Sequence, residues 1–232
     1  ASGADPVKKT LVRLAVPGMT AERSLRLLTP KETILPEERN VEIKTENRTG
    51  RYYVYVKGDV LLSTDKISEA VITANENFGV VIGDNQKYVW KRARKTAQNA
   101  FSDIGTSGEN AGEGSIAQCI NAMLEKEGIN INVEALIASG ETPKSILHNT
   151  MRDAVVLDLT GCSVDEILYY VSCGSPVFAM TESEEAVLIV GYDAGSISIY
   201  DPKLGITYRE SIAEADELFA NVGKVFFTYL TE

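Results

Sequence analysis

Alternation of apolar and polar residues is clearest between residues 51 and 93. RYYVYVKGDVLLST (51–64) predicts a β-hairpin that turns at Lys57-Gly58-Asp59, and GVVIGDNQKYVWKRA (79–93) predicts a second hairpin around Gly83 to Gln86. The intervening segment DKISEAVITANENF has the spacing of an amphipathic helix, whose apolar face consists of Ile67, Ala70, Val71 and Ala74. We therefore expect a compact ββαββ unit. The first 50 residues give weaker signals: an amphipathic stretch, AERSLRLL, and an alternating one, VEIKTE.

The pattern changes after residue 114. Four segments with helical spacing come first: SIAQCINAMLEKEG, NVEALIASG, TPKSILHNTM and SVDEILYYVSCG. Apolar strand candidates follow, namely PVFAM, AVLIVGYD, SISIYDP, GITYRE and, after a helix SIAEADELFANVG, the last strand KVFFTYL. Helices first and antiparallel-type strands afterwards predict an α+β domain.

Charge divides the chain near the same place. Residues 1–100 hold 17 Lys and Arg against 12 Asp and Glu, a net charge of +5, and residues 101–232 hold 6 against 21, a net charge of −15. Asn99 to Gly114 is rich in Gly, Ser and Asn, as loops are. We therefore predict two domains, a small α+β domain at 1–100 and a second domain at 101–232. The acidic second domain should repel nucleic acid and anionic membranes.

Several classes of protein fit the sequence poorly. No apolar run reaches the roughly 20 residues of a membrane helix, and the opening ASGADPVKKT lacks the apolar centre of a signal peptide. We expect a soluble chain whose only link to a membrane would be a segment absent from it. Cys119, Cys162 and Cys173 form no metal-binding spacing, so we expect free buried thiols, no metal and no cofactor.

The segments GSPVFAM, AVLIVGYD and IYDP carry a family resemblance. From about Gly114 to Leu230 the chain resembles the C39-like peptidase domain of bacteria, which has a papain-like fold. In that family a Cys opens the first helix, a His precedes the strand that ends in Gly-Tyr-Asp, and an Asp or Asn before a Pro orients the His. The matching positions here are Ser115, Glu185 and Asp201. The resemblance thus implies a degenerate triad that keeps one of its three residues.

Chemistry argues against catalysis by this set. A serine nucleophile needs a base that takes up and returns its proton near neutral pH, whereas glutamate has a reference pKa of about 4.3. The single histidine of the chain, His148, lies far upstream of the strand where the base is expected. Asn110 is the one amide in the region where the family places its oxyanion-hole residue.

Each candidate also has a structural interpretation, which we favour. Ser115 and Gln118 fit an S-x-x-Q capping box. Cys119, the rival nucleophile, lies on an apolar stripe and is expected in the core. His148 is expected at or near the surface.

The N-terminal hairpins bear aromatic residues next to Lys and Arg. Tyr52, Tyr88 and Trp90 belong to this cluster and form a possible ligand surface for sugars, peptides or bases, although alternation should bury about half of the rings.

Three hypotheses follow. The first is an inactive C39-like pseudopeptidase that binds a peptide or protein partner at the cell envelope of a Gram-positive bacterium. It would lie outside the cytoplasm and be membrane-anchored in the full-length protein, as the resemblance implies. The second is an active peptidase that uses Cys119 or Ser115 with His148 or Glu185. The third is a module that binds cell-wall peptidoglycan through the basic aromatic residues.

Overall fold

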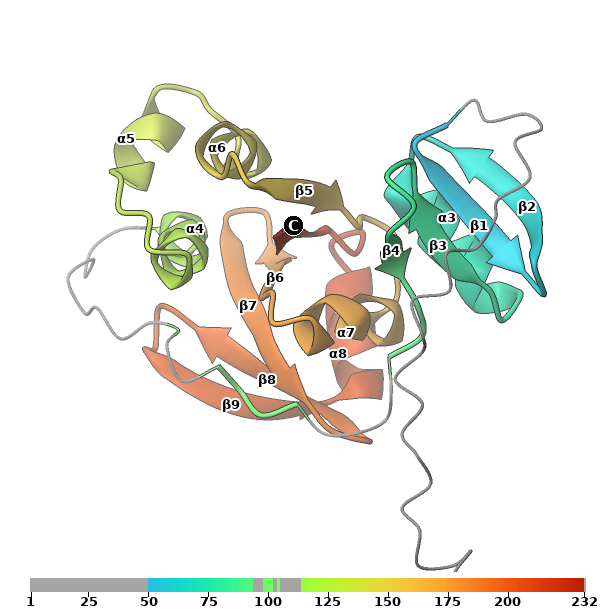
Figure 1. Ribbon diagram of the computed structural model, residues 1–232. Helices are drawn as coiled ribbons and strands as arrows, with labels where there is room; N and C mark the ends of the chain where they lie inside the picture. The colour runs from blue at the N-terminus through green and yellow to red at the C-terminus, as the bar shows by residue number, and fades with distance from the viewer. Residues whose placement is uncertain (1–49, 94–97, 102–103, 105–113, 232) are drawn as a thin grey trace, which may run out of the picture. The chain divides into compact units, whose positions relative to one another are not determined.

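The computed structural model describes residues 50–93, 98–101, 104 and 114–231, all within a compact unit of residues 46–232. It is an α+β structure with two antiparallel sheets (Figure 1). The segments AERSLRLL and VEIKTE, whose patterns are weaker, lie outside the described residues.

The smaller sheet has four strands in the order β2-β1-β3-β4. Both predicted hairpins and the helix between them are confirmed, with the bounds β1 Tyr52–Val56, β2 Asp59–Thr64, α3 Ile67–Glu76, β3 Val80–Gly83 and β4 Tyr88–Trp90. The first hairpin turns at Lys57 and Gly58, whose φ angles of 53° and 99° are left-handed. Such angles suit a tight hairpin turn and are least strained at glycine. Ile67, Ala70, Val71 and Ala74 are buried, as the helical spacing predicted.

The four helices predicted after residue 114 are also present, as α4 Ser115–Lys126, α5 Val133–Ala138, α6 Pro143–Thr150 and α7 Val164–Ser172. Side chains define several of their starts. Thr142 accepts a hydrogen bond from the backbone N–H of Ser145, and Ser163 forms a capping box with Glu166.

The larger sheet has the strand order β5-β10-β6-β7-β8-β9. The predicted elements are β6 Val177–Glu182, β7 Glu185–Tyr192, β8 Ser196–Asp201, β9 Ile206–Ser211, α8 Ile212–Ala220 and β10 Phe226–Thr231. One strand was not predicted: β5 (Ala154–Asp158), which pairs with β10 at the edge of the sheet. Its segment, AVVLD, is short and has no alternation of its own, so pairing with a distant strand defines it.

Strand β7 is buried on both faces. Leu188 and Val190 belong to a cluster with Ile120 of α4, whereas Val187 and Ile189 belong to the cluster that contains α7. A strand covered on both sides needs apolar residues at successive positions, which explains the uninterrupted run AVLIV.

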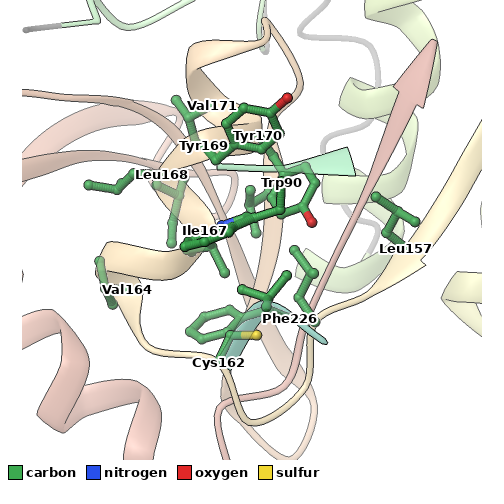
Figure 2. Close-up of a cluster of buried hydrophobic side chains, with 14 of the residues drawn as sticks. Trp90, Leu157, Cys162, Val164, Ile167, Leu168, Tyr169, Tyr170, Val171 and Phe226 are labelled. Atoms are coloured by element: carbon green, nitrogen blue, oxygen red, sulfur yellow. The ribbon is translucent and has the colours of Figure 1, made fainter. Parts of the chain in front are cut away.

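The two sheets contribute to one hydrophobic cluster. Trp90 of β4 lies with Ile167 and Leu168 of α7 and with Phe226 of β10 (Figure 2). Within the described unit, the small sheet is therefore packed against the larger one through α7. The predicted boundary near residue 101 stays a prediction.

A short segment after the small sheet pairs with β7. The backbone N–H of Gln98 donates to the carbonyl oxygen of Tyr192 at 2.7 Å, and the N–H of Tyr192 returns a bond to Gln98 at 2.8 Å. Gly191 permits this approach, because a Cβ there would lie 2.7 Å from the backbone nitrogen of Ala100. The segment thus extends the sheet where β6 no longer pairs with β7.

Candidate functional site

Ser115 lies at the start of α4, against the beginning of β7. Its side chain is buried, with 2% of the residue exposed, and its hydroxyl oxygen accepts a hydrogen bond from the backbone N–H of Ala186 at 3.1 Å. The N-cap of α4 is Gly114, which has no capping side chain, so the predicted capping box of Ser115 and Gln118 is wrong. The serine instead ties the helix to the strand that Glu185 opens.

Glu185 is the first residue of β7, and its carboxylate forms an ion pair with the ammonium group of Lys203. This pairing raises the pKa of Lys203, so the lysine stays charged. The carboxylate of Glu185 is thus engaged with Lys203 rather than with Ser115. Glu185 is therefore poorly suited to act as a base toward Ser115. The described structure records no hydrogen bond between these two side chains.

Asp201 ends β8 and caps the turn that carries Lys203. Its Oδ1 accepts hydrogen bonds from the backbone N–H groups of Lys203, at 2.9 Å, and of Leu204, at 3.2 Å. Such an Asx turn is a common structural role for aspartate. Ser115, Glu185 and Asp201 thus lie on three elements that are linked by the Ala186 hydrogen bond and by Lys203.

Cys119 is fully buried one turn further along α4. Burial, and secondly the negative charge of Asp201, raises the pKa of its thiol well above the ordinary value. Since the thiolate is the nucleophilic form, a buried thiol with a raised pKa is poorly suited to act as a nucleophile. The expectation of a core position is confirmed. Cys119 and Cys162 are buried and free, but Cys173 is exposed, so the expectation that all three thiols are buried is wrong for Cys173.

His148 is exposed in the last turn of α6. Between the described residues, no hydrogen bond joins it to Ser115 or Cys119. The structure therefore provides neither candidate nucleophile with the imidazole base that a triad requires.

The aromatic candidates have different environments. Trp90 is 1% exposed, and its indole N–H donates to the backbone carbonyl oxygen of Glu166 at 2.7 Å, so its assignment to a ligand surface is wrong. Tyr52 is half-buried and Tyr88 is exposed, and both line a cleft of about 470 Å³. Tyr169 of α7 and Val155 of β5 also line this cleft. These two residues are distant in sequence, so no sequence signal could have placed them there. Asn110 lies outside the described residues.

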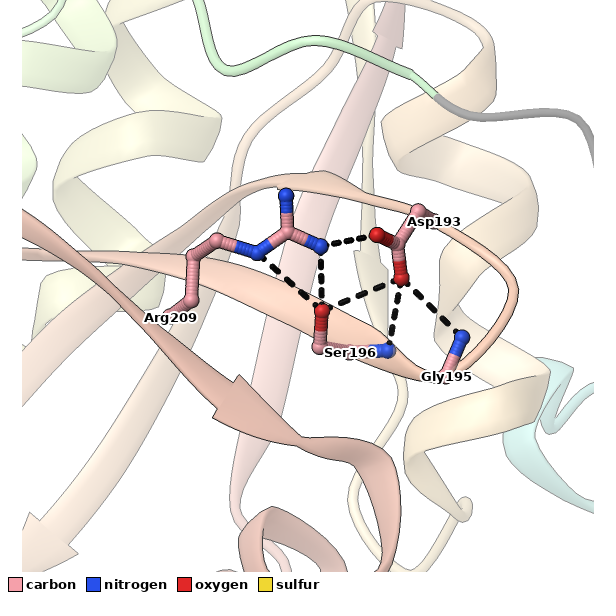
Figure 3. Close-up of polar contacts among 4 residues, drawn as sticks. All are labelled: Asp193, Gly195, Ser196 and Arg209. Atoms are coloured by element: carbon pink, nitrogen blue, oxygen red, sulfur yellow. Dashed lines mark hydrogen bonds and ion pairs between the residues drawn. The ribbon is translucent and has the colours of Figure 1, made fainter.

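The Asp of the Gly-Tyr-Asp motif has a structural role. Oδ1 of Asp193 accepts hydrogen bonds from the N–H groups of Gly195, at 3.0 Å, and of Ser196, at 2.9 Å, and its other oxygen is paired with Arg209 (Figure 3). These donors hold the pKa of Asp193 far below its ordinary value. The motif therefore marks the turn between β7 and β8.

Within the described ranges, no group of three or more His, Cys, Asp or Glu side chains is placed to hold a metal ion. None of the described helices is long and apolar enough to cross a membrane.

Comparison with known proteins finds similarity to solved structures but not to any family model or curated protein. A solved structure from Bacillus anthracis, described as a "putative C39-like peptidase", aligns with a TM-score of 0.46 and 16% sequence identity, over 52% of this chain and 90% of that one. A similarity of this extent establishes neither a shared fold nor a shared activity.

Proposed function

We propose that this chain contains a papain-like, C39-like domain whose peptidase site is degenerate, and that it binds a peptide or protein partner without cutting it. The observation that carries the proposal is the meeting of α4, β7 and β8 at Ser115, Glu185 and Asp201. These are the three positions at which the C39-like resemblance expects a triad. Each side chain there has a structural partner, and none of the partners is an imidazole.

The surface next to these residues supports binding. Leu204, in the turn after Asp201, is 66% exposed, and Ile206 at the start of β9 is 50% exposed. Large apolar side chains at a hairpin turn gain free energy when a partner covers them. We propose that the partner contacts this turn and that the protein acts at a bacterial cell envelope.

A peptide panel tests both parts of the proposal. The protein is incubated with peptides, among them a leader peptide with a double-Gly site, and cleavage is followed by mass spectrometry while binding is followed by fluorescence anisotropy. We expect binding without cleavage. Leu204→Ser should weaken binding about tenfold, since roughly 1.5 kcal/mol of apolar burial is lost. Leu218→Ser is the matched control, because Leu218 is 38% exposed on α8, away from this turn.

Cleavage that disappears in both Ser115→Ala and Glu185→Gln would replace this proposal with an active peptidase. The second variant is needed because Ser115→Ala leaves the Ala186 N–H without its partner and lowers stability by about 1–3 kcal/mol. Glu185 is half-exposed, so its substitution leaves the fold intact. Equal binding by the Leu204→Ser variant and wild-type protein would move the contact elsewhere and end the present assignment of the surface.

A further inference from the structure

A second cavity lies at the opposite end of β7 from Glu185. Its volume is about 730 Å³, within the range of small-molecule sites, and its wall includes Arg92, Asp165, Leu168, Tyr192, Asp193 and Asp216. Strand β7 has eight residues, so its two ends are about 23 Å apart. This cavity is therefore separate from the surface assigned above.

Two of the four charged side chains in its wall are already neutralised. Asp193 is paired with Arg209, and Asp216 is paired with Lys224 at 2.7 Å. Among the described residues, Arg92 and Asp165 have no ionic partner. The cavity thus offers one positive and one negative group to a ligand.

Arg92 is held in place before any ligand arrives. Its Nε and Nη2 atoms donate to Oδ1 of Asn75 at 3.1 and 2.6 Å, and Nη2 also donates to the Asn75 carbonyl oxygen at 2.8 Å. Asn75 is itself fixed, because its amide nitrogen donates to Glu166 at 2.9 Å. In the described structure Nη1 forms no hydrogen bond. A guanidinium fixed on one side, with a donor left over, is suited to bind a carboxylate.

Phe78 stacks against the same guanidinium from the C-terminal end of α3. The guanidinium carbon lies 4.9 Å from the centre of the phenyl ring, yet Phe78 is 84% exposed and has a φ of 55°. Phe78 follows the C-cap of α3, where the N–H of Gly79 donates to the carbonyl oxygen of Ala74 at 2.7 Å, so its left-handed backbone belongs to the end of that helix. The ring contributes little to the core, but it helps to hold Arg92 in position.

Asp165 is exposed in the first turn of α7, and the wall of the cavity that it shares with Arg92 also contains apolar side chains. Leu168 of α7 and Ile212 of α8 supply part of that wall. We propose that this cavity binds a small zwitterion with an apolar body, the chemistry of an α-amino acid or a short peptide. The ligand's carboxylate pairs with Arg92, its ammonium group pairs with Asp165, and its side chain lies against the apolar wall.

Titration of the full chain with leucine, leucyl-leucine, N-acetylleucine and leucinamide tests this assignment. Binding is measured by calorimetry and by the amide NMR signals of Ala194 and Gly195, which line the cavity. We expect leucine or leucyl-leucine to bind at least about tenfold more tightly than either blocked compound, because each blocked compound loses one charged contact. Tighter binding of leucine would indicate an amino-acid site, and tighter binding of leucyl-leucine would indicate a peptide site.

Two variants assign the charges separately. Asp165→Asn should remove the preference for leucine over N-acetylleucine and keep the preference over leucinamide, and Arg92→Gln should do the reverse. Glu134→Gln and Arg152→Gln are the matched controls, since Glu134 occupies the first turn of α5 and Arg152 is an exposed arginine. Thermal unfolding of each variant verifies that it is folded.

The proposal is overturned if leucine and leucyl-leucine both fail to shift the Ala194 and Gly195 signals. It is also overturned if blocked and free compounds bind equally. A ligand that needs only one of the two charges would bind more tightly than one of the blocked compounds but no more tightly than the other, which also contradicts a zwitterion site. All of these outcomes leave the peptide surface at Leu204 untested, so the two proposals fail independently.

Discussion

Trp90 offers a direct test of whether the small sheet and the larger one unfold together. Its ring belongs to the same cluster as Ile167 and Phe226 (Figure 2), and its indole N–H donates to Glu166 of α7 at 2.7 Å. Trp90→Phe keeps an aromatic ring in place but removes this hydrogen bond and part of the packing. The substitution therefore weakens the contact between β4 and α7 specifically.

The expected loss has two parts. Removing a buried hydrogen bond between neutral groups costs about 1 kcal/mol. The smaller ring leaves a void of roughly 40 Å³, which at about 24 cal/mol per Å³ costs about 1 kcal/mol more. The free energy of unfolding should fall by about 2 kcal/mol, and the melting temperature by about 4–8 °C for a chain of this size.

Urea unfolding measures this loss. Trp90 is the single tryptophan, so its fluorescence reports the small sheet in the wild type, whereas far-UV circular dichroism reports the whole chain and serves for the variant. The two wild-type transitions should coincide. Tyr88→Phe, an exposed change on the same strand, is the control and should alter stability by less than about 0.5 kcal/mol.

Two results would refute this reasoning. Wild-type transitions that separate by fluorescence and circular dichroism would mean that the small sheet unfolds by itself, in support of the two-domain prediction. A loss below about 0.5 kcal/mol in Trp90→Phe would mean that the contact with α7 adds little to stability.

Three further predictions concern single residues. Gly191→Ala should lower the free energy of unfolding by about 1–3 kcal/mol, because the added Cβ would meet the backbone of Ala100. Hydrogen exchange at the Tyr192 amide should then become faster, and unchanged exchange would contradict the close approach. The pKa of Asp193 is lower in the folded than in the unfolded protein, so its contribution to stability is present above about pH 4 and is lost as the pH falls below that value. Between pH 6 and pH 3 the free energy of unfolding should therefore fall more steeply in wild type than in Asp193→Asn. Parallel curves for the two proteins would contradict this prediction. A thiol-specific reagent should modify the exposed Cys173 of the native protein before the buried Cys119, and mass spectrometry that finds Cys119 labelled first at neutral pH would revive the cysteine nucleophile.

Local pattern was sufficient for most of the secondary structure. The apolar face of α3 and the turn at Lys57 and Gly58 follow from nearest-neighbour spacing and from backbone preferences, both of which a single sequence displays. Strand β5 was not predicted, because its stability comes from pairing with β10, which lies about 70 residues later in the chain.

Side-chain roles were harder to predict than elements. The sequence favoured a capping box for Ser115, but its hydroxyl accepts a hydrogen bond from a backbone N–H of a strand about 70 residues away. Trp90 and Tyr88 lie two residues apart, positions that share a face in a regular strand, yet Trp90 is buried and Tyr88 is exposed. The pairing of β4 with β3 is irregular between them, and α7 covers Trp90 alone of the two rings. Which ring would be covered depends on an element that the local pattern cannot locate.

The sequence by itself determined that this is an α+β chain, where most of its helices and strands begin and end, and that a single imidazole is available. These properties depend on composition and on short-range periodicity. The tertiary structure alone decided that the lone imidazole forms no hydrogen bond with Ser115 or Cys119 in the described residues, that Lys203 pairs with Glu185, and that Arg92 and Asp165 line one cavity. Contacts between residues far apart in the chain arise from packing of whole elements, and no local pattern records which faces will meet.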